Sequence, residues 1–210
     1  MLLSSLKPNP EPKLRYEEYS LDPISASTVL HLAFSMKDIE EKYVVDLGCG
    51  SGILSIGAAL IGARRIVGID IDEDSIRVAQ VNIKSLGVRV ELIAGSIECV
   101  RPSFDTTVMN PPFGSWKRGL DIQFLTKAIG ISRVVYTIHK ANEKSDVFLR
   151  KKIKDIGGDI RKLGRLEITI PRLFKFHQKA RYKVIATLYR ITRQPKKLET
   201  DSFPATHPIA

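Results

Sequence analysis

A glycine-rich turn constrains this chain more than any other part of its sequence. Residues 43–47 read YVVDL, a run with strong β preference, and residues 48–52 read GCGSG before the apolar stretch 53–62. Glycines at such a place let the backbone turn tightly and approach a ligand closely. The pattern predicts a strand, a ligand-binding turn and a helix in succession, which is how an α/β sheet begins.

The same alternation continues along the chain. Further β-rich runs lie at 65–69, 88–93, 104–109, 133–138, 163–170 and 181–191. Helical patterns lie at 22–36, 72–86, 119–129 and 143–156. Alternating strands and helices favour a parallel sheet covered on both faces, and two final strands without a helix between them favour an antiparallel C-terminal strand. The prediction is a Rossmann-like α/β fold with a mainly parallel seven-stranded sheet.

The 210 residues suit one domain with extensions at its ends. Residues 7–13 hold three prolines at every second position, so residues 1–15 are expected to form an extended N-terminal arm. Residues 193–210 also hold three prolines and show little periodicity, so they are expected to form a flexible tail. The folded domain is therefore predicted to span 16–192.

The compartment is indicated by what the sequence lacks. No apolar run approaches the ~18–20 residues of a membrane span, and Lys7 interrupts the short apolar start, so neither a membrane segment nor a signal peptide is predicted. Cys49 and Cys99 form neither a CxxC pair nor a disulfide framework. Neither they nor the histidines show a metal-ligand spacing. A reducing, cytoplasmic location is expected.

Positive charge is concentrated in one quarter of the chain. The net charge is +10, and 16 of the 33 lysines and arginines lie within residues 150–197, together with three acidic residues. Basic residues gathered in this way suit an anionic partner such as nucleic acid, although a solvated basic surface gives the same pattern.

Carboxylates on both sides of the glycine-rich turn indicate its ligand. Asp46 stands two positions before Gly48, where it would repel the pyrophosphate of a dinucleotide and attract a cationic ligand. S-adenosylmethionine carries an ammonium and a sulfonium. Asp70 follows Gly48 by 22 residues, close to the ~20-residue interval at which a carboxylate meets ribose hydroxyls. The plain alternative is a tight turn with a helix N-cap at Asp70 or Asp72.

The predicted strand 104–109 runs into Asn110, Pro111, Pro112 and Phe113. Carboxyl ends of parallel strands face the ligand crevice, so this tetrapeptide should lie beside the cofactor. The Asn110 side-chain oxygen and the Pro111 carbonyl can each accept one N–H of a planar amine and direct its lone pair at a methyl group. Phe113 offers a face on which a base can stack. A simple Asn-Pro-Pro turn that closes the strand is the alternative.

Together, segments 46–52, 68–72 and 110–113 resemble those of class I S-adenosylmethionine-dependent amino-group methyltransferases. More closely, the chain resembles the methyltransferase-like protein 5 family, which methylates the 6-amino group of an adenine in small-subunit ribosomal RNA. The resemblance covers roughly residues 13–192. It is carried by segments 16–19, 44–74, 104–114, 136–140 and 175–179.

The resemblance implies specific contacts. Cofactor contacts fall on Glu18, Tyr19, Asp46, Gly48, Gly50, Asp70 and Ile71, with Asn110 between cofactor and acceptor. The chain departs from the family twice: Glu18 replaces a common Gln, and Ser96 stands near where a carboxylate often binds the cofactor's adenine amino group. Ser96 stays a candidate for that contact. The resemblance also implies a small zinc-ribbon activator protein that pairs along a sheet edge.

Two further features carry weaker signals. Residues 174–179 read FKFHQK, so Phe174, Lys175, Phe176, His177 and Lys179 form an aromatic and basic loop that suits unstacked bases and phosphates. Two Phe residues anchoring a loop to the core would look the same. His139, at a predicted strand end, is interpreted as structural, because methyl transfer to an amine needs no imidazole base.

Three functions compete. The first is an RNA adenine methyltransferase, and the rival enzyme is a protein glutamine methyltransferase, whose Asn-Pro-Pro-aromatic motif serves an amide in the same geometry. The third is a non-catalytic cofactor-binding subunit or RNA-binding scaffold. The basic segment favours RNA over a protein amide, and the complete tetrapeptide argues against an inactive scaffold. The arm 1–15 is a candidate for helping to place the substrate.

Overall fold

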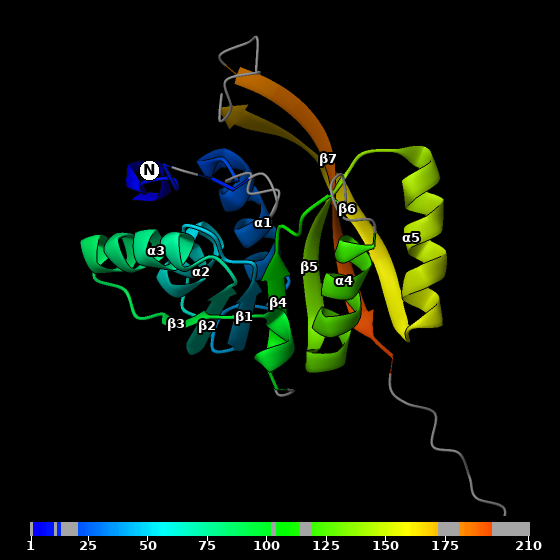
Figure 1. Ribbon diagram of the computed structural model, residues 1–210. Coiled ribbons are helices and arrows are strands. Elements are labelled where there is room, and N and C mark those ends of the chain that lie inside the picture. Colours follow the sequence, from blue (N-terminus) through cyan, green and yellow to red (C-terminus); the bar gives the residue numbers. More distant parts are fainter. Residues whose placement is uncertain are drawn as a thin grey trace, which may run out of the picture.

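The computed structural model describes residues 2–10, 12–13, 21–101, 104–113, 119–171 and 181–194. Within them, seven strands form one sheet in the order β3-β2-β1-β4-β5-β7-β6 (Figure 1). The strands are β1 (Tyr43–Leu47), β2 (Arg65–Asp70), β3 (Glu91–Ala94), β4 (Phe104–Met109), β5 (Ser132–Lys140), β6 (Gly158–Pro171) and β7 (Arg181–Arg193). β7 is antiparallel to both neighbours, and the remaining pairs are parallel. The predicted fold is confirmed, with β7 inside the sheet and β6 at its edge.

Helices cover the sheet on both faces. They are η1 (Leu2–Ser5), α1 (Pro23–Ser35), α2 (Ile53–Leu60), α3 (Glu73–Leu86), η3 (Ile97–Cys99), α4 (Leu120–Ile131) and α5 (Glu143–Asp155). α1 begins where the sequence predicts, because the Asp22 carboxylate accepts the N–H groups of Ile24 and Ser25 at 3.1 and 3.0 Å. Across the described ranges, no helix combines the length and apolarity that a bilayer crossing demands.

Two strands begin three or more residues away from their predicted starts. β3 begins at Glu91 instead of 88, since the side chains of Val88 and Val90 pack against the core while pairing with β2 starts only at Glu91. β6 begins at Gly158 instead of 163, because it continues to pair with β7 through an irregularity between Lys162 and Gly164. That irregularity breaks the period-2 pattern from which a strand is read in sequence.

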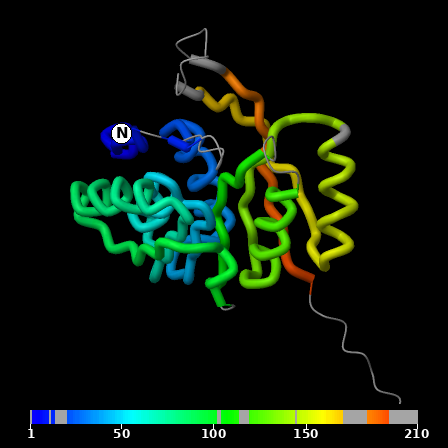
Figure 2. The backbone as a smooth tube through the Cα atoms, viewed as in Figure 1, coloured from blue at the N-terminus to red at the C-terminus, as the bar shows by residue number. Residues whose placement is uncertain are grey.

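Figure 2 follows the backbone through the sheet and the helices that pack against it. The core has two halves, one on each face of the sheet. η1, α1 and α2 pack on one face around residues such as Leu30 and Ile56. α4 and α5 pack on the other around Leu125 and Ile153. The carboxyl ends of the parallel strands lie together at one edge of the sheet, where ligands bind in folds of this type.

The β6/β7 hairpin extends beyond that edge. β5 ends at Lys140, opposite Ala186 of β7, but β6 and β7 continue for five more pairs, from Glu167 with Ile185 to Pro171 with Arg181. In Figure 1 the hairpin rises past the ends of the central strands. It is thereby placed to flank whatever binds at the carboxyl ends.

Candidate active site

The glycine-rich turn after β1 has the backbone that only glycine adopts readily. Gly48, Gly50 and Gly52 have φ values of 72°, 52° and 87°. Close packing adds a second constraint, because a Cβ on Gly48 would lie 3.2 Å from the Phe124 ring and one on Gly52 would lie 3.3 Å from Ala79. The N–H groups of Gly48 and Cys49 both donate to the Ile69 carbonyl, at 2.9 and 3.0 Å, which ties the turn to β2.

Asp46 lies directly below this turn and is 1% exposed. Its Oδ2 accepts the Ser55 N–H at 3.0 Å and the Ser55 hydroxyl at 2.6 Å. Its Oδ1 is buried and accepts no hydrogen bond within the described part of the chain. Burial raises the pKa of Asp46 to about 7, and the bonds from Ser55 oppose that rise. A carboxylate in this state is suited to a cationic or hydrogen-bond-donating ligand.

Asp70 ends the neighbouring strand β2 and is also buried. Its Oδ2 accepts the Gly50 N–H at 2.8 Å, and its Oδ1 accepts the Asp72 N–H at 2.9 Å. Each oxygen keeps a lone pair, so the carboxylate can still accept two hydroxyls side by side. Burial raises the pKa of this carboxyl, while the backbone bonds oppose the rise. Ile71 beside it exposes 55% of its surface, an apolar face at the mouth of the site.

The end of β3 adjoins the same region. The Gly95 N–H donates to the Asp70 carbonyl at 2.7 Å, so the residues after β3 are held against the end of β2. Ser96 follows, and its hydroxyl accepts the Glu98 N–H at 3.3 Å as the cap of η3. The Ser96 hydroxyl hydrogen can still donate a hydrogen bond, and its oxygen already accepts one from the Glu98 N–H.

Asn110 continues directly from β4, which lies between β1 and β5. Asp46 pairs with Gly68 of β2 on one side and with Val108 of β4 on the other. The side chains of Asp46, Asp70 and Asn110 therefore belong to three adjacent strands at their carboxyl ends. Pro111 and the Oδ1 atom of Asn110 are buried, while Pro112 and Phe113 are half-buried.

Glu18 and Tyr19 lie outside the described residues, as do Phe174, Lys175, Phe176, His177 and Lys179.

No group of three or more metal-ligating side chains was found where the structure is described. His139 is buried, and burial lowers its pKa to about 4. Its Nε2 lies 3.0 Å from the Thr137 hydroxyl, which agrees with a structural interpretation.

Sequence reasoning missed two residues that hold the site. Ser55 binds one oxygen of Asp46 twice, and Asn82 on α3 donates to the Ser51 carbonyl inside the glycine-rich turn at 2.9 Å. Each reads in the sequence as an ordinary polar residue of a helix. Only the contact in space reveals its role.

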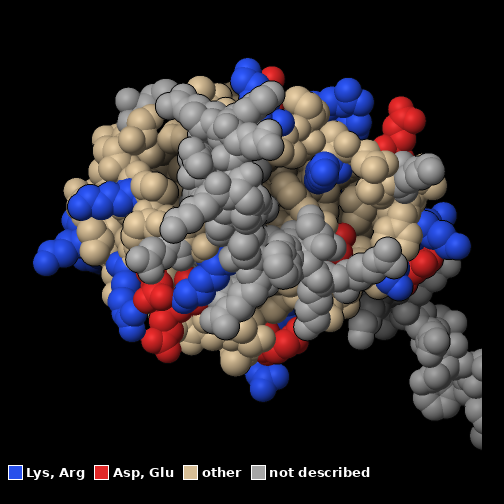
Figure 3. Space-filling model, turned by 45° about the horizontal axis from the view of Figure 1, so that its top comes forward, with Lys and Arg blue, Asp and Glu red and all other residues tan. Residues whose placement is uncertain are grey.

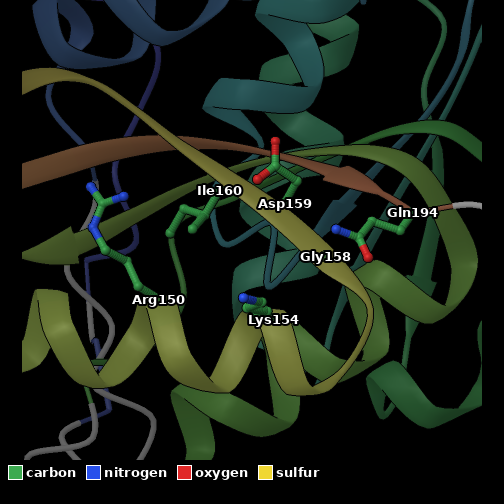
Figure 4. Close-up of a pocket in the computed structure, with 6 residues that line it drawn as sticks. All are labelled: Arg150, Lys154, Gly158, Asp159, Ile160 and Gln194. Atoms are coloured by element: carbon green, nitrogen blue, oxygen red, sulfur yellow. The ribbon is translucent and has the colours of Figure 1, made fainter.

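A separate pocket of about 400 Å³ lies between α5 and the start of β6 (Figure 4). It is lined by Arg150, Lys154, Gly158, Asp159, Ile160 and Gln194. Gly158 begins β6, which runs parallel to the central strands, so the pocket lies toward their amino ends. It is therefore distinct from the site formed by Asp46, Asp70 and Asn110.

Comparison with known proteins gives one family that matches only part of the chain and another that matches most of it. A family model described as "Ribosomal protein L11 methyltransferase (PrmA)" matches residues 27–110. The Danio rerio protein named rRNA N(6)-adenosine-methyltransferase METTL5 is 34% identical over 190 residues, 87% of this chain and 91% of that protein. The Drosophila melanogaster protein of the same name is 35% identical over 183 residues, 80% of this chain and 82% of its own length.

A solved structure agrees. The crystal structure of PH1948 from Pyrococcus horikoshii superposes with a TM-score of 0.86 and 36% identity, and the match covers 92% of this chain and 95% of that one. The L11 model covers only residues 27–110, whereas the matches to the two METTL5 proteins cover 87% and 80% of the chain. The chain belongs to the METTL5 family of rRNA N(6)-adenosine methyltransferases.

Proposed function

We propose that this protein transfers the methyl group of S-adenosylmethionine to the 6-amino group of an adenosine in small-subunit ribosomal RNA. One observation carries the proposal above all others. Two buried carboxylates, Asp46 and Asp70, and the Asn110–Phe113 segment lie at the ends of adjacent strands in a family of adenosine methyltransferases.

The described residues fit the cofactor. Asp70 would accept the two ribose hydroxyls, since both of its oxygens keep a free lone pair beyond their backbone bonds. Oδ1 of Asp46 would receive a donor from the cationic methionine end, directly or through water. Ile71 would cover one face of the adenine, and Ser96, Gly48 and Gly50 would complete the wall. Glu18 and Tyr19 are proposed as further contacts. When bound, the cofactor supplies an electrophilic methyl group on a sulfonium.

The acceptor is handled by Asn110 to Phe113. The Asn110 Oδ1 and the Pro111 carbonyl would each accept one N–H of the adenine amine, with the base stacked on Phe113. These bonds draw the nitrogen toward tetrahedral geometry and direct its lone pair at the methyl carbon. An N–C bond forms as the S–C bond breaks, and the product nitrogen then loses a proton to water. Positioning and electrostatics suffice for this step, and the buried, neutral His139 is not needed as a base.

RNA is proposed to approach along α5 and the β6/β7 hairpin. On α5, Val147 and Phe148 expose 70% and 56% of their surfaces and are followed by Arg150, Lys151, Lys152 and Lys154. Among the described side chains, Lys151, Lys152 and Lys154 form no ion pair. The loop with Phe174, Lys175, Phe176, His177 and Lys179 is proposed to contact RNA as well. Figure 3 shows lysine and arginine side chains at several places around the face turned to the viewer, some beside acidic ones.

A zinc-ribbon activator protein is proposed to pair with the edge strand β3. Among the described strands β3 pairs with β2 alone, which makes it an edge strand that a partner strand could extend, and Ile93 on it is 40% exposed. A cytoplasmic location is also proposed, because Cys49 and Cys99 are both free thiols.

Methyl-labelled S-adenosylmethionine offers the test of the proposed reaction. The protein is incubated with it and with either small-subunit RNA or a protein extract, and Asn110→Ala serves as the inactive control. We expect label in RNA, recovered as N6-methyladenosine, and none with the variant. Label that appears only in protein glutamine would overturn the proposal in favour of an amide methyltransferase.

A further inference from the structure

The described residues of the N-terminal segment 2–13, which are 2–10, 12 and 13, are packed onto the cofactor half of the molecule. Leu3 is buried in the core formed with α1 and α2. Four residues later the chain meets α3, where the Lys7 N–H donates to Oδ1 of Asn82 at 2.9 Å and Nδ2 of Asn82 donates back to the Lys7 carbonyl at 2.8 Å. The Asn82 amide thus pairs with a backbone unit as a neighbouring strand would.

Asn82 connects this segment to the glycine-rich turn. It is 1% exposed, and its Nδ2 also donates to the carbonyl of Ser51, at 2.9 Å. Ser51 lies between Gly50 and Gly52, two of the left-handed residues that shape the turn. Three hydrogen bonds to one buried amide fix the turn and the segment relative to each other, since an unpaired buried polar group would be costly.

A second connection reaches the ribose side of the site. Nδ2 of Asn9 donates to the Ser75 hydroxyl at 2.9 Å, and that hydroxyl lies 3.4 Å from the carboxylate of Asp72. Lys13 forms ion pairs with Asp72 and, at 2.8 Å, with Asp74. The N–H of Asp72 in turn donates to Asp70. The segment is therefore joined to both loops that surround the cofactor position.

We propose that residues 2–13 are a positioning element of the cofactor site, and that their docking on α3 raises the affinity for S-adenosylmethionine. The segment orders the glycine-rich turn through Asn82 and the loop after β2 through Asp72 before any ligand arrives, so less order has to be gained on binding. This inference rests on the cofactor assignment made above. It gives the N-terminal arm a task on the cofactor side, away from the basic α5 surface.

Long-range electrostatics alone predicts the opposite change in cofactor affinity when Lys13 is removed, which makes the proposal testable. Lys13 is a positive charge beside a site for a cationic cofactor, so removing it would strengthen binding if only long-range charge mattered. If docking matters, Asn9→Ala combined with Lys13→Ala weakens cofactor binding, by about fivefold to tenfold for a partly undocked segment. Turnover at saturating cofactor and the affinity for RNA stay within about twofold of wild type.

Arg77→Ala is the matched control. Arg77 pairs with Glu73 and with Asp74, at 3.3 and 2.6 Å, within α3, so the change removes a nearby positive charge and leaves the segment docked. A second variant, Lys7→Pro, removes the N–H that donates to Asn82, together with the Lys7 charge, and is expected to weaken cofactor binding in the same direction.

Calorimetric titration with S-adenosylmethionine, and hydrogen exchange of residues 2–13 with and without it, give the readouts. We expect weaker binding for both segment variants, wild-type binding for Arg77→Ala, and slower exchange of the segment when cofactor is bound, because the coupling is reciprocal. Unchanged binding in the folded segment variants, or equal weakening in Arg77→Ala, would overturn this inference alone. Failure of the wild type to bind the cofactor would instead overturn the proposed function.

Discussion

The Gly50 N–H donates to Oδ2 of Asp70 at 2.8 Å, so the glycine-rich turn and the end of β2 are fixed to each other by the carboxylate that we propose as the ribose acceptor. The remaining oxygen of Asp70 is held by the N–H of Asp72. A single side chain therefore orders two loops and still has lone pairs to offer a ligand.

Asp70→Ala should weaken S-adenosylmethionine binding by about 1.5–3 kcal/mol, the usual scale of a charge-assisted hydrogen bond. Isothermal titration of the folded variant measures this. Glu73→Gln, an exposed carboxylate three residues further along that pairs with Arg77, serves as the control and should bind like wild type. Wild-type affinity in Asp70→Ala would remove Asp70 from the cofactor site.

Asp46 should make cofactor binding depend on pH. Its pKa is about 7, so the charged form that attracts a cationic ligand increases as the pH rises through neutrality, and affinity should rise with it. The stability of the ligand-free protein should instead fall as the pH rises. A carboxyl whose pKa is raised on folding from 3.8 to about 7 binds more protons in the native state, so its contribution to stability falls as the pH rises through that window.

Asp46→Asn should remove both dependences, because the amide keeps the shape but not the charge. Titrations between about pH 5.5 and pH 8.5 compare the two proteins across the relevant ionisation. Parallel affinity curves for wild type and variant would show that Asp46 does not titrate in the binding reaction.

Asn110→Ala should leave cofactor binding largely intact and reduce methyl transfer by at least about 100-fold, since only the acceptor loses its hydrogen-bond partner. Single-turnover transfer to RNA, measured beside cofactor titration, separates the two effects. Turnover within about threefold of wild type would exclude the amine-orienting role of Asn110.

Charge reversal on α5 should weaken RNA binding. Lys151→Glu with Lys154→Glu removes two cations that form no ion pair with any side chain that the structure describes, and RNA affinity should fall by at least about tenfold, whereas cofactor affinity should not change. Wild-type affinity should also fall with salt, at a slope of about −0.7 per phosphate contact on single strands. Lys84→Glu with Arg89→Glu makes the same change of net charge at and just after the end of α3, and equal losses in the two double variants would argue against a specific surface.

The sequence predicts the parts of this site that depend on local pattern. A strand followed by alternating glycines positions Asp46, the next strand end positions Asp70, and the rule for parallel strands brings Asn110 beside them. The contacts of Asn82 with Lys7 and Ser51 could not be foreseen, because they join residues 75 and 31 positions apart and no repeat or motif marks them. Proline spacing alone predicts an extended arm at residues 1–15. The burial of Leu3 and the hydrogen bonds between Lys7 and Asn82 on α3 depend on tertiary packing, which a local pattern does not encode.

The strand limits also show which features follow from local pattern and which depend on long-range pairing. β1 and β4 were predicted at their observed ends, since hydrophobic runs of strand length are bounded by polar or glycine-rich residues. β6 was predicted too short because the irregularity at Lys162–Gly164 shifts its alternation from one face to the other. The position of β7 inside the sheet depends on long-range pairing with β5, which a local pattern does not encode.

The central claim is adenosine methylation of small-subunit ribosomal RNA, and mass-spectrometric mapping of that RNA tests it most directly. RNA is compared from cells that contain the wild-type protein, cells that lack it and cells that carry only Asn110→Ala. The account predicts one N6-methyladenosine that is present with the wild type and absent in the other two. An unchanged pattern of RNA methylation in all three, with a methylated glutamine lost from a protein instead, would contradict it.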